Sequence, residues 1–255
     1  MVNITNVIGA IRAQDAQSRK LRADRILDTA AELLLRWGYA RVTIDDVASQ
    51  AGIGKGTVYL HYRTREELFF SVIMREQAAA TDELIEAVRR DPREALLHRL
   101  IRLKYLSAMR RPILRAAIAA DPEILGRLVD AAKGSDLGKL LGLVSFEYFQ
   151  LLMEHSLVKP GITVPELIYG VGAVTIGFFT GDAFLGAFSG SASMERKADL
   201  LEAAIESTFS LPASEDTLRA IAPAVIELYA KSREISQAYL ERAYEARLSR
   251  TGESP

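Results

Sequence analysis

The chain has 255 residues, of which 49% are hydrophobic and 25% are charged. This length and composition are typical of a folded protein with one large domain or two smaller ones, and they exclude the disordered and fibrous classes. The absence of Cys excludes disulfides and thiolate chemistry, and three His residues leave little for a metal centre. We therefore expect no metal and no cofactor.

The formal net charge is −1, from 32 Lys and Arg against 33 Asp and Glu, so a partner recognised by charge must be recognised locally. Residues 1–75 carry a surplus of +3 and the remainder carries −4. Within that first part, Arg19, Lys20, Arg22 and Arg25 are countered only by Asp24. This cluster could belong to an arm that reaches the minor groove of DNA, or it could be an ordinary solvated helix end. The residues alone favour the solvated helix end.

Residues 1–11 have neither a basic start nor a continuous apolar run, so we expect no secretory signal and a cytoplasmic location. The one membrane-like window, residues 167–181, is shorter than the ~20 residues that a spanning helix needs, and it contains several glycines. We expect a buried helix there and no membrane partner.

Helical spacing of apolar residues begins at Ile26 and ends at Trp37, where Gly38 is a plausible helix stop. A second helix is predicted from Thr43, because its hydroxyl can accept a hydrogen bond from the backbone N–H of Asp46. These two signals place a connection of a few residues between the first two helices.

The segment that follows has the order of a helix-turn-helix motif. A Gly-containing turn at residues 52–54 precedes a short helical segment at 55–62, and Thr64 with Glu67 has the form of a capping box that starts a further helix. A three-helix packing unit with a polar face would give the same pattern, because helix-turn-helix matches are often false.

The short segment carries side chains suited to DNA. Lys55 fits a guanine edge, Thr57 fits a phosphate or a thymine methyl, and Gly56 removes bulk where the backbone would approach the groove. Tyr59, Tyr62 and His61 can donate to phosphates, although the tyrosines also suit half-buried spacers. Arg65 adds charge at the start of the next helix.

Residues 26–73, with TIDDVASQAGIGKGTVYLHYRTREEL at residues 43–68, resemble the N-terminal domain of the TetR/AcrR family of transcriptional regulators. The resemblance implies an all-helical homodimer whose third helix enters the major groove and whose variable C-terminal domain binds a small molecule. The positions at which family members touch DNA are, in this sequence, Thr43, Lys55, Thr57, Tyr59, His61, Tyr62 and Arg65.

The sequence also departs from the family pattern. Gly54 stands where the family often has Ser or Thr, so we expect a less firmly capped recognition helix. Tyr62 stands where Phe is common. Asp45 and Asp46 leave the start of the second helix without a basic side chain, which shifts the expected base reading onto Lys55.

Beyond residue 75 the pattern predicts helix after helix, separated by Pro and Gly signals. The predicted segments are residues 74–90, 93–109, 112–119, 122–132, 135–158, 165–188 and 194–209. A tail helix follows, which Pro223 should kink or restart. We predict an all-α fold with an arm (1–20), a helix-turn-helix domain (21–73), a ligand-binding and dimerisation domain (74–212) and a helical extension (213–255). The extension could cover a pocket, enlarge a dimer or bind another protein.

Small residues form a stripe at helical spacing in segment 165–188, namely Gly170, Ala173, Gly177 and Gly181. Such stripes favour close helix packing, either within the chain or across a dimer. In the family that it resembles, the last two helices of the common core build the dimer interface, and segments 165–188 and 194–209 occupy those places.

Seven residues could line a cavity for a small apolar or amphipathic ligand. They are Arg102, Tyr105, Met109, Phe146, Phe149, Met153 and His155. Aromatic and Met residues at helical spacing are more often plain core, so each one alone is weak evidence for a ligand.

The sequence therefore predicts a ligand-responsive regulator, a repressor by resemblance, that binds a palindromic DNA operator as a homodimer and is released by a small molecule. A partner-binding helical protein without a DNA function is the main alternative. An all-helical enzyme is a further one, but the sequence has no metal-ligand spacing, no phosphate-binding Gly-Lys-Ser/Thr and no Gly-x-Ser-x-Gly. We therefore expect no catalytic residue.

Overall fold

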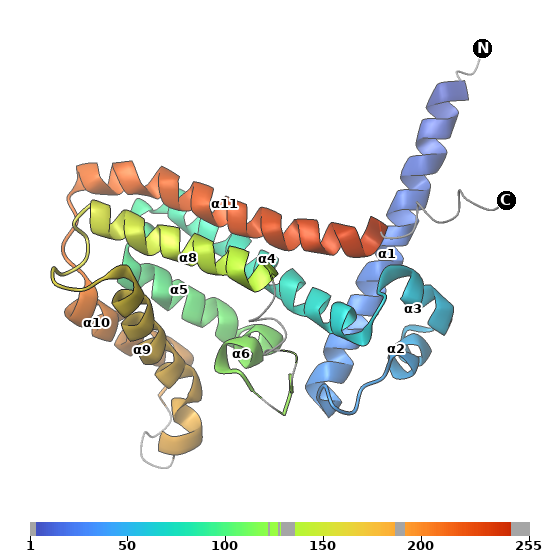
Figure 1. Cartoon of the computed structure of the whole chain (residues 1–255), viewed down its shortest axis with the longest axis horizontal. Coiled ribbons are helices and arrows are strands. Elements are labelled where there is room, and N and C mark those ends of the chain that lie inside the picture. The colour runs from blue at the N-terminus through green and yellow to red at the C-terminus, as the bar shows by residue number, and fades with distance from the viewer. Residues whose placement is uncertain (1–3, 122, 127, 129–135, 187–191, 246–255) are drawn as a thin grey trace.

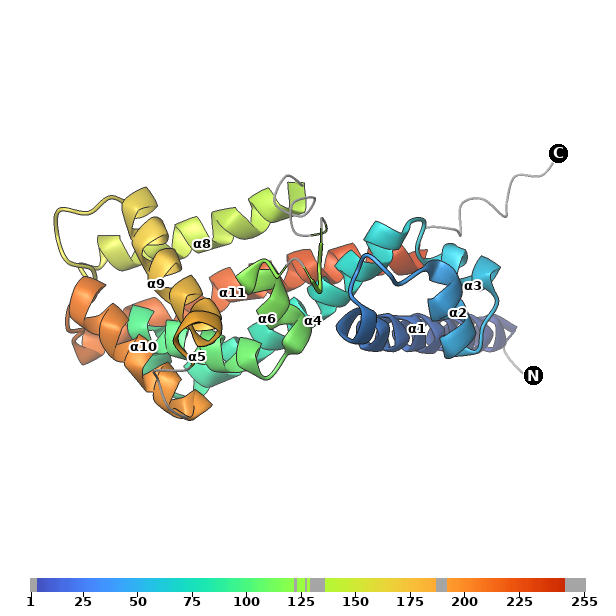
Figure 2. The same ribbon diagram turned by 90° about the horizontal axis from the view of Figure 1, so that it is seen from below.

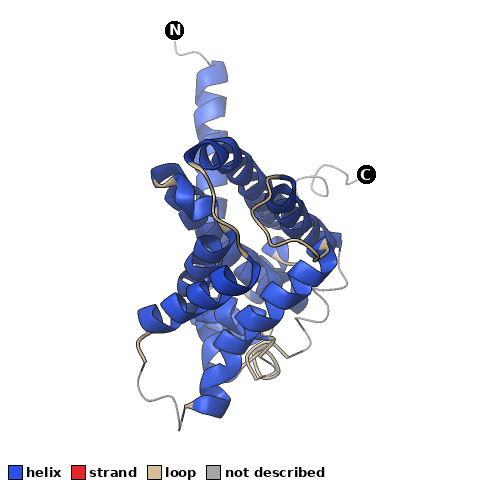
Figure 3. Cartoon of the chain, turned by 90° about the vertical axis from the view of Figure 1, so that its left-hand side faces the viewer, coloured by secondary structure: helices blue, strands red, loops and turns tan. Residues whose placement is uncertain are grey.

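The computed structural model describes residues 4–121, 123–126, 128, 136–186 and 192–245. In these ranges every regular element is helical, apart from an isolated bridge between Val158 and Ser210 (Figure 3). The predicted all-α class is confirmed. The helices are α1 (Ile4–Trp37), α2 (Ile44–Ala51), α3 (Lys55–His61), α4 (Arg65–Arg90), α5 (Leu97–Met109, after the 3₁₀ turn η1, Pro92–Ala95), α6 (Pro112–Ala119), α8 (Asp136–Glu154), α9 (Val164–Leu185), α10 (Met194–Phe209) and α11 (Glu215–Glu245).

The molecule is elongated, with α1, α2 and α3 at one end and α5, α8, α9 and α10 at the other (Figures 1 and 2). The long helices α4 and α11 lie side by side and run between the two ends. Each end has its own hydrophobic core: one is built around α1 to α4, and the other around α5, α8, α9, α10 and the first half of α11. We call the first end, residues 21–73, the reader, and the hydrophobic core at the other end the distal core.

Three long helices run through positions where the sequence predicts a break. The N-terminal residues from Ile4 onward continue into α1 without a break, so they are not a separate arm. Helix α4 runs through the predicted domain boundary at residues 73 and 74. Helix α11 passes Pro223 without interruption. Pro223 is exposed, so water can solvate the carbonyl that its missing N–H leaves unbonded. Most of the predicted helix 122–132 lies outside the described residues.

The connection between α1 and α2 contacts the segment that follows α6. Gly38 ends α1 with a positive φ of 73°, and a Cβ placed on it would lie 2.2 Å from the carbonyl oxygen of Glu123. The next residue, Tyr39, donates its backbone N–H to the carbonyl of Ile124 at 2.8 Å. Only glycine allows both the left-handed conformation and this approach.

The C-terminal helix α11 contributes to both cores. Its first half buries Ile221 and Val225 in the distal core, and its end buries Leu240 in the core of the reader. Tyr239 packs edge-on against Phe70 of α4, with ring centroids 5.1 Å apart. Helix α11 thus lies along its own chain, against α4 and α8, and reaches α1 and α3.

Helix α9 corrects the expectation of a buried helix. It spans 22 residues, and an 18-residue window has a mean hydropathy of 1.4, so it is long and apolar enough to cross a membrane by length and composition. Only 11% of that window is buried within the chain. Leu167 and Val171 face the core, whereas Tyr169 and Phe184 are 79% and 78% exposed. Neighbouring helices of the single chain cover one side of α9 only.

We predict that Gly38→Ala destabilises the protein more than Gly52→Ala does. Both glycines have a positive φ, 73° and 66°, but nothing lies within 4 Å of a Cβ on Gly52. The left-handed conformation alone should cost about 1–2 kcal/mol, and the collision with Glu123 should add about 1–3 kcal/mol for Gly38→Ala. Urea unfolding measures both. Equal losses would show that the contact with residues 123–124 is not tight in solution.

Candidate nucleic-acid interface

Local hydrogen bonds fix the two helices of the helix-turn-helix as the sequence predicts. The Thr43 hydroxyl accepts from the Asp46 N–H, and the Asp46 carboxylate accepts from the Thr43 N–H at 2.8 Å, which completes a capping box. Gly52 ends α2 in the left-handed conformation. Gly54 begins α3 without a side-chain hydrogen bond, as expected from its departure from the family pattern. Thr64 caps α4 by accepting from the Glu67 N–H.

One face of α3 is open to solvent. Lys55 and Gly56 are exposed, Tyr59 and Leu60 are 40% and 46% exposed, and Thr57 is half-buried. This face presents an ammonium, a hydroxyl and a phenol, with a bare backbone at Gly56. These are the donors and the clearance that base and phosphate contacts require.

Lys55 is held across the elbow between α2 and α3. Its ammonium donates to the Asp45 carboxylate at 2.7 Å, and this hydrogen bond and the Asp45 charge raise the pKa of Lys55. Both side chains are exposed, and exposed ion pairs contribute little to stability. Lys55 can therefore leave Asp45 for a base edge at small cost.

Two residues predicted to face DNA lie inside instead. Tyr62 is fully buried in the core of the reader, and His61 is 6% exposed. Both follow the buried Val58 by a helical turn, so they share its inward direction. The hydrophobic environment, followed by the charges of Arg22 and Arg19, lowers the pKa of His61. The prediction that these two side chains lie on the exposed face is wrong.

Arg65 binds the chain rather than projecting into solvent. Its guanidinium donates to the carbonyls of Tyr39 and Val42, both at 3.1 Å, and lies 4.0 Å from the centroid of the Tyr39 ring. The Tyr39 hydroxyl in turn donates to Glu66 at 2.6 Å. This hydrogen bond, the largest of several causes, lowers the pKa of Glu66. Arg65 thus joins the start of α4 to the α1–α2 connection, a role that no local sequence signal reveals.

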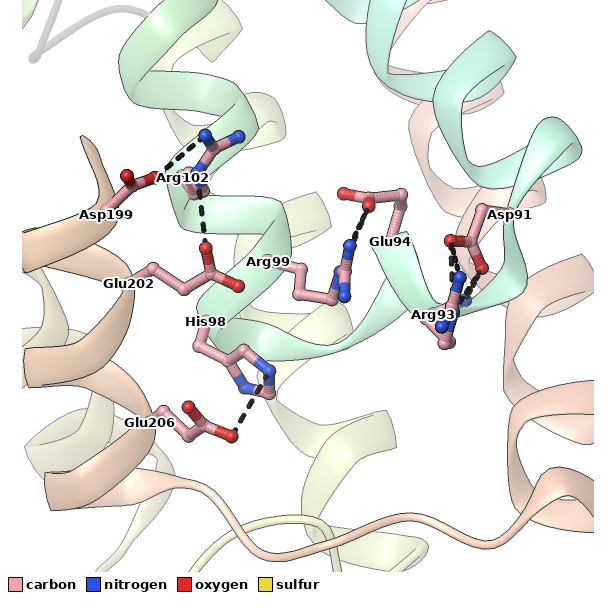
Figure 4. Close-up of polar contacts among 9 residues, drawn as sticks. All are labelled: Asp91, Arg93, Glu94, His98, Arg99, Arg102, Asp199, Glu202 and Glu206. Carbon is pink, nitrogen blue, oxygen red and sulfur yellow. Dashed lines mark hydrogen bonds and ion pairs between the residues drawn. The ribbon is translucent and has the colours of Figure 1, made fainter. Parts of the chain in front are cut away.

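The seven residues predicted to line a ligand cavity do not meet in one place. Arg102 is ion-paired with Asp199 at 2.8 Å and with Glu202 at 3.2 Å, between α5 and α10 (Figure 4). Phe146 is 39% exposed on α8, and the Nδ1 of His155 lies 3.0 Å from the carbonyl of its own helix. The other four belong to the distal core or pack against it: Tyr105, Met109, Phe149 and Met153.

Two hollows on the surface lie away from these seven residues. A groove of about 530 Å³ between α4 and α5 is lined by residues that include Glu83 and Arg110, and one of about 310 Å³ between α8 and α11 includes Glu154 and Lys231. Neither is lined by any of the seven. Among the seven residues, Tyr105 has a hydroxyl that is buried without a hydrogen-bond partner in the described structure. A buried unpaired hydroxyl costs free energy, so a partner would stabilise it.

The small-residue stripe of α9 divides between two environments. A Cβ on Gly170 would meet the Phe209 ring of α10 at 2.9 Å, so Gly170 packs within the chain. Ala173 and Gly177 are exposed, and nothing lies within 4 Å of a Cβ on Gly177. A Cβ on Gly181 would be in ordinary contact with Leu185. The small-residue stripe therefore packs within the chain at Gly170 and is exposed at Ala173 and Gly177.

Comparison with known proteins agrees with this geometry. Residues 26–72 match the family model described as bacterial regulatory proteins, tetR family. The chain is 37% identical over 68 residues to the uncharacterised regulator YhgD of Bacillus subtilis, covering 26% of this chain and 36% of that protein. It is 30% identical over 81 residues to the transcriptional activator FasR of Mycolicibacterium smegmatis, covering 32% of this chain and 35% of that protein. These matches span about a third of the relatives' length.

Solved structures share the fold over a longer part of the chain. A putative transcriptional regulator from Streptomyces coelicolor superposes with a TM-score of 0.53 at 24% identity, covering 74% of this chain and 98% of its own. A putative TetR-family regulator from Shewanella sp. PV-4 gives 0.50 at 18% identity, covering 75% and 99%. The class is thus an all-helical protein with an N-terminal helix-turn-helix domain. Residues 26–72 thus form a helix-turn-helix domain of the tetR family of bacterial regulatory proteins, a family of transcriptional regulators and not of enzymes.

We predict that Arg65→Ala lowers the free energy of unfolding by about 1–3 kcal/mol, because two carbonyls lose a charged donor. Arg65→Lys should restore only part of this, since an ammonium cannot reach both carbonyls and stack on Tyr39 at once. Arg63→Ala is the control, as Arg63 is an exposed neighbour of the same charge. Thermal unfolding compares the three. If Arg65→Ala melts like Arg63→Ala, the contacts of Arg65 do not stabilise the reader.

Proposed function

We propose that this protein is a homodimeric, ligand-responsive regulator that binds a palindromic operator in double-stranded DNA, represses transcription there and is released by a small apolar or amphipathic molecule. It acts in the cytoplasm, where its DNA is. The observation that supports this most directly is the exposed face of α3, with Lys55, Gly56, Thr57 and Tyr59, on a helix-turn-helix of the TetR family.

Each exposed side chain has a distinct proposed role. Lys55 reads a guanine edge in the major groove, Thr57 contacts a phosphate or a thymine methyl, and Tyr59 donates to a phosphate. Thr43, exposed at the start of α2, contacts the backbone at the edge of the groove. Two copies of α3 in successive major grooves require half-site centres about 34–36 Å apart, or a multiple of that.

The open face of α9 supports the homodimer. Apolar side chains such as Ile176 and Phe184 are 47% and 78% exposed there, beside the open Gly177 and Ala173. A second copy of α9 would bury these side chains, and the small residues would let the two helices approach closely. On α10, Leu200 is 43% exposed and would extend the same interface.

The buried hydroxyl of Tyr105 supports a ligand site in the distal core. It lies among apolar neighbours, with the Phe178 and Phe179 rings of α9 at centroid distances of 6.5 and 5.0 Å. An amphipathic ligand that offers this hydroxyl an acceptor would bind between α5 and α9. Its effect on DNA binding is limited to its difference in affinity for the two forms of the dimer.

Selection of bound DNA from a random pool tests the DNA function. We expect a palindromic consensus, and we expect Lys55→Ala to lose discrimination between bases by about 1–3 kcal/mol while retaining general binding. Tyr105→Phe should leave the consensus intact but weaken release by candidate ligands. A pool that yields no enriched DNA at low salt would favour the partner-binding alternative, and increased transcription from a bound promoter would show an activator.

For the dimer, we predict that Gly177→Glu gives a monomer whose helicity is unchanged. The side chain has open space in the single chain but would place a charge in the proposed interface. Gly142→Glu on α8 is the matched control, because it is also an exposed helical glycine with nothing within 4 Å of its Cβ. Sedimentation velocity measures the mass. A dimer that persists in Gly177→Glu would place the interface elsewhere.

A further inference from the structure

The exposed reading surface lacks the positive charge that DNA binding requires. Between residues 43 and 61 the charged side chains are Asp45, Asp46 and Lys55, which sum to −1 with His61 neutral. Lys55 is moreover ion-paired with Asp45. Affinity for duplex DNA depends largely on cations that neutralise phosphates and release counterions. The helix-turn-helix can therefore discriminate between bases but supplies almost none of this electrostatic term.

Arg65 does not make up the deficit, since its guanidinium is bound to the carbonyls of Tyr39 and Val42. Arg41 and Arg63 are exposed beside the motif and bring one charge each. Residues 19–25 of α1 bring four cations and one anion, a net charge of +3 within two helical turns. This segment is the densest source of positive charge in residues 1–73.

The position of this segment in the structure suits a contact with DNA. Lys20, Arg22 and Arg25 are exposed and Arg19 is half-buried. Helix α1 is in contact with α3, so the segment lies near the recognition helix. After burial, the charges of Arg22 and Arg19 also lower the pKa of His61, the last residue of α3. The Nε of Arg22 donates to the Ser18 carbonyl at 3.2 Å, which is a neutral acceptor.

The direction of α1 indicates which part of the DNA would be met. The helix continues N-terminally past α2 and α3, and its first turns stand clear of the other labelled helices (Figure 1). Its N-terminus and the open face of α9 lie toward opposite ends of the molecule. In a dimer formed through α9, the two α1 helices would therefore extend toward the outer ends of the operator.

We propose that the basic segment of α1, with Arg19, Lys20, Arg22 and Arg25, is a second DNA-contact surface that binds phosphates flanking each half-site. It binds as a rigid helix against the sugar-phosphate backbone, so it adds affinity and little sequence information. The inference rests on the proposed function, because it assumes that α3 occupies the major groove.

The test is the salt dependence of operator binding by Arg19→Gln/Arg22→Gln. Each lost phosphate contact should reduce the log–log salt slope by about 0.9, so the double variant should lose about 1.8 in slope and about 10- to 60-fold in affinity at 0.1 M salt. Arg89→Gln/Arg90→Gln is the matched control, with the same change of net charge at the distant end of α4. The consensus selected from random DNA should not change.

A second measurement locates the contact. Operators trimmed to the half-sites should bind wild type and Arg19→Gln/Arg22→Gln about equally, whereas operators with flanking DNA should bind wild type more tightly. If Arg19→Gln/Arg22→Gln fails to fold, as judged by helicity and melting, Lys20→Gln/Arg25→Gln is measured in its place. A salt slope equal to that of the control overturns this inference alone. The proposed function fails instead if wild type selects no DNA.

Discussion

The attachment of the helix-turn-helix to the rest of the chain is the constraint on which this structure depends. A short reading helix is useful only if its position relative to a second copy is held, and α3 has just seven residues. Three connections hold it: the unbroken helix α4, the hydrogen bond from Tyr39 to the Ile124 carbonyl, and the end of α11 with Tyr239 and Leu240 in or against the core of the reader. The connections lie on different parts of the chain, two on helices and one between turns, so the described structure attaches the reader to the body at more than one point.

This attachment has a consequence for ligand control. A ligand between α5 and α9 would act far from α3, and it needs elements that contact both ends. Helix α4 is one such element. Helix α11 is another, because it packs against α4 along its length and contributes Ile221 to the distal core and Leu240 to the core of the reader. A change in the distal core that moves α11 would therefore tilt the reader even where α4 stays straight. The distance between the two readers of a dimer would then depend on both α4 and α11.

Local chemistry explains what the sequence predicted well. The caps at Thr43 and Thr64, the end of α1 at Trp37 and the bounds of α10 depend on residues a few positions apart, so they can be read from the chain. The inward direction of His61 and Tyr62 could not be read in this way, since polar aromatic side chains suit a core and a surface equally. The exposed face of α9 could not be foreseen either, because its hydrophobicity is the same whether its own chain or a second copy covers it.

The proposed contacts assign sequence specificity and DNA affinity to different helices. A strongly basic α3 would bind phosphates at any DNA sequence, so the difference in binding free energy between sites would be a small part of the total. Here Lys55 is ion-paired with Asp45. If Lys55 reads a base as proposed, a guanine edge would replace Asp45 as its partner, whereas a wrong base would leave the ion pair in place. In this proposal the cations that hold the duplex are the exposed Lys20, Arg22 and Arg25 and the half-buried Arg19 of α1. In this proposal, sequence preference comes from the exchange of the Lys55 ammonium between Asp45 and a guanine edge. The contact of α1 with phosphates holds the protein on the DNA while that exchange takes place.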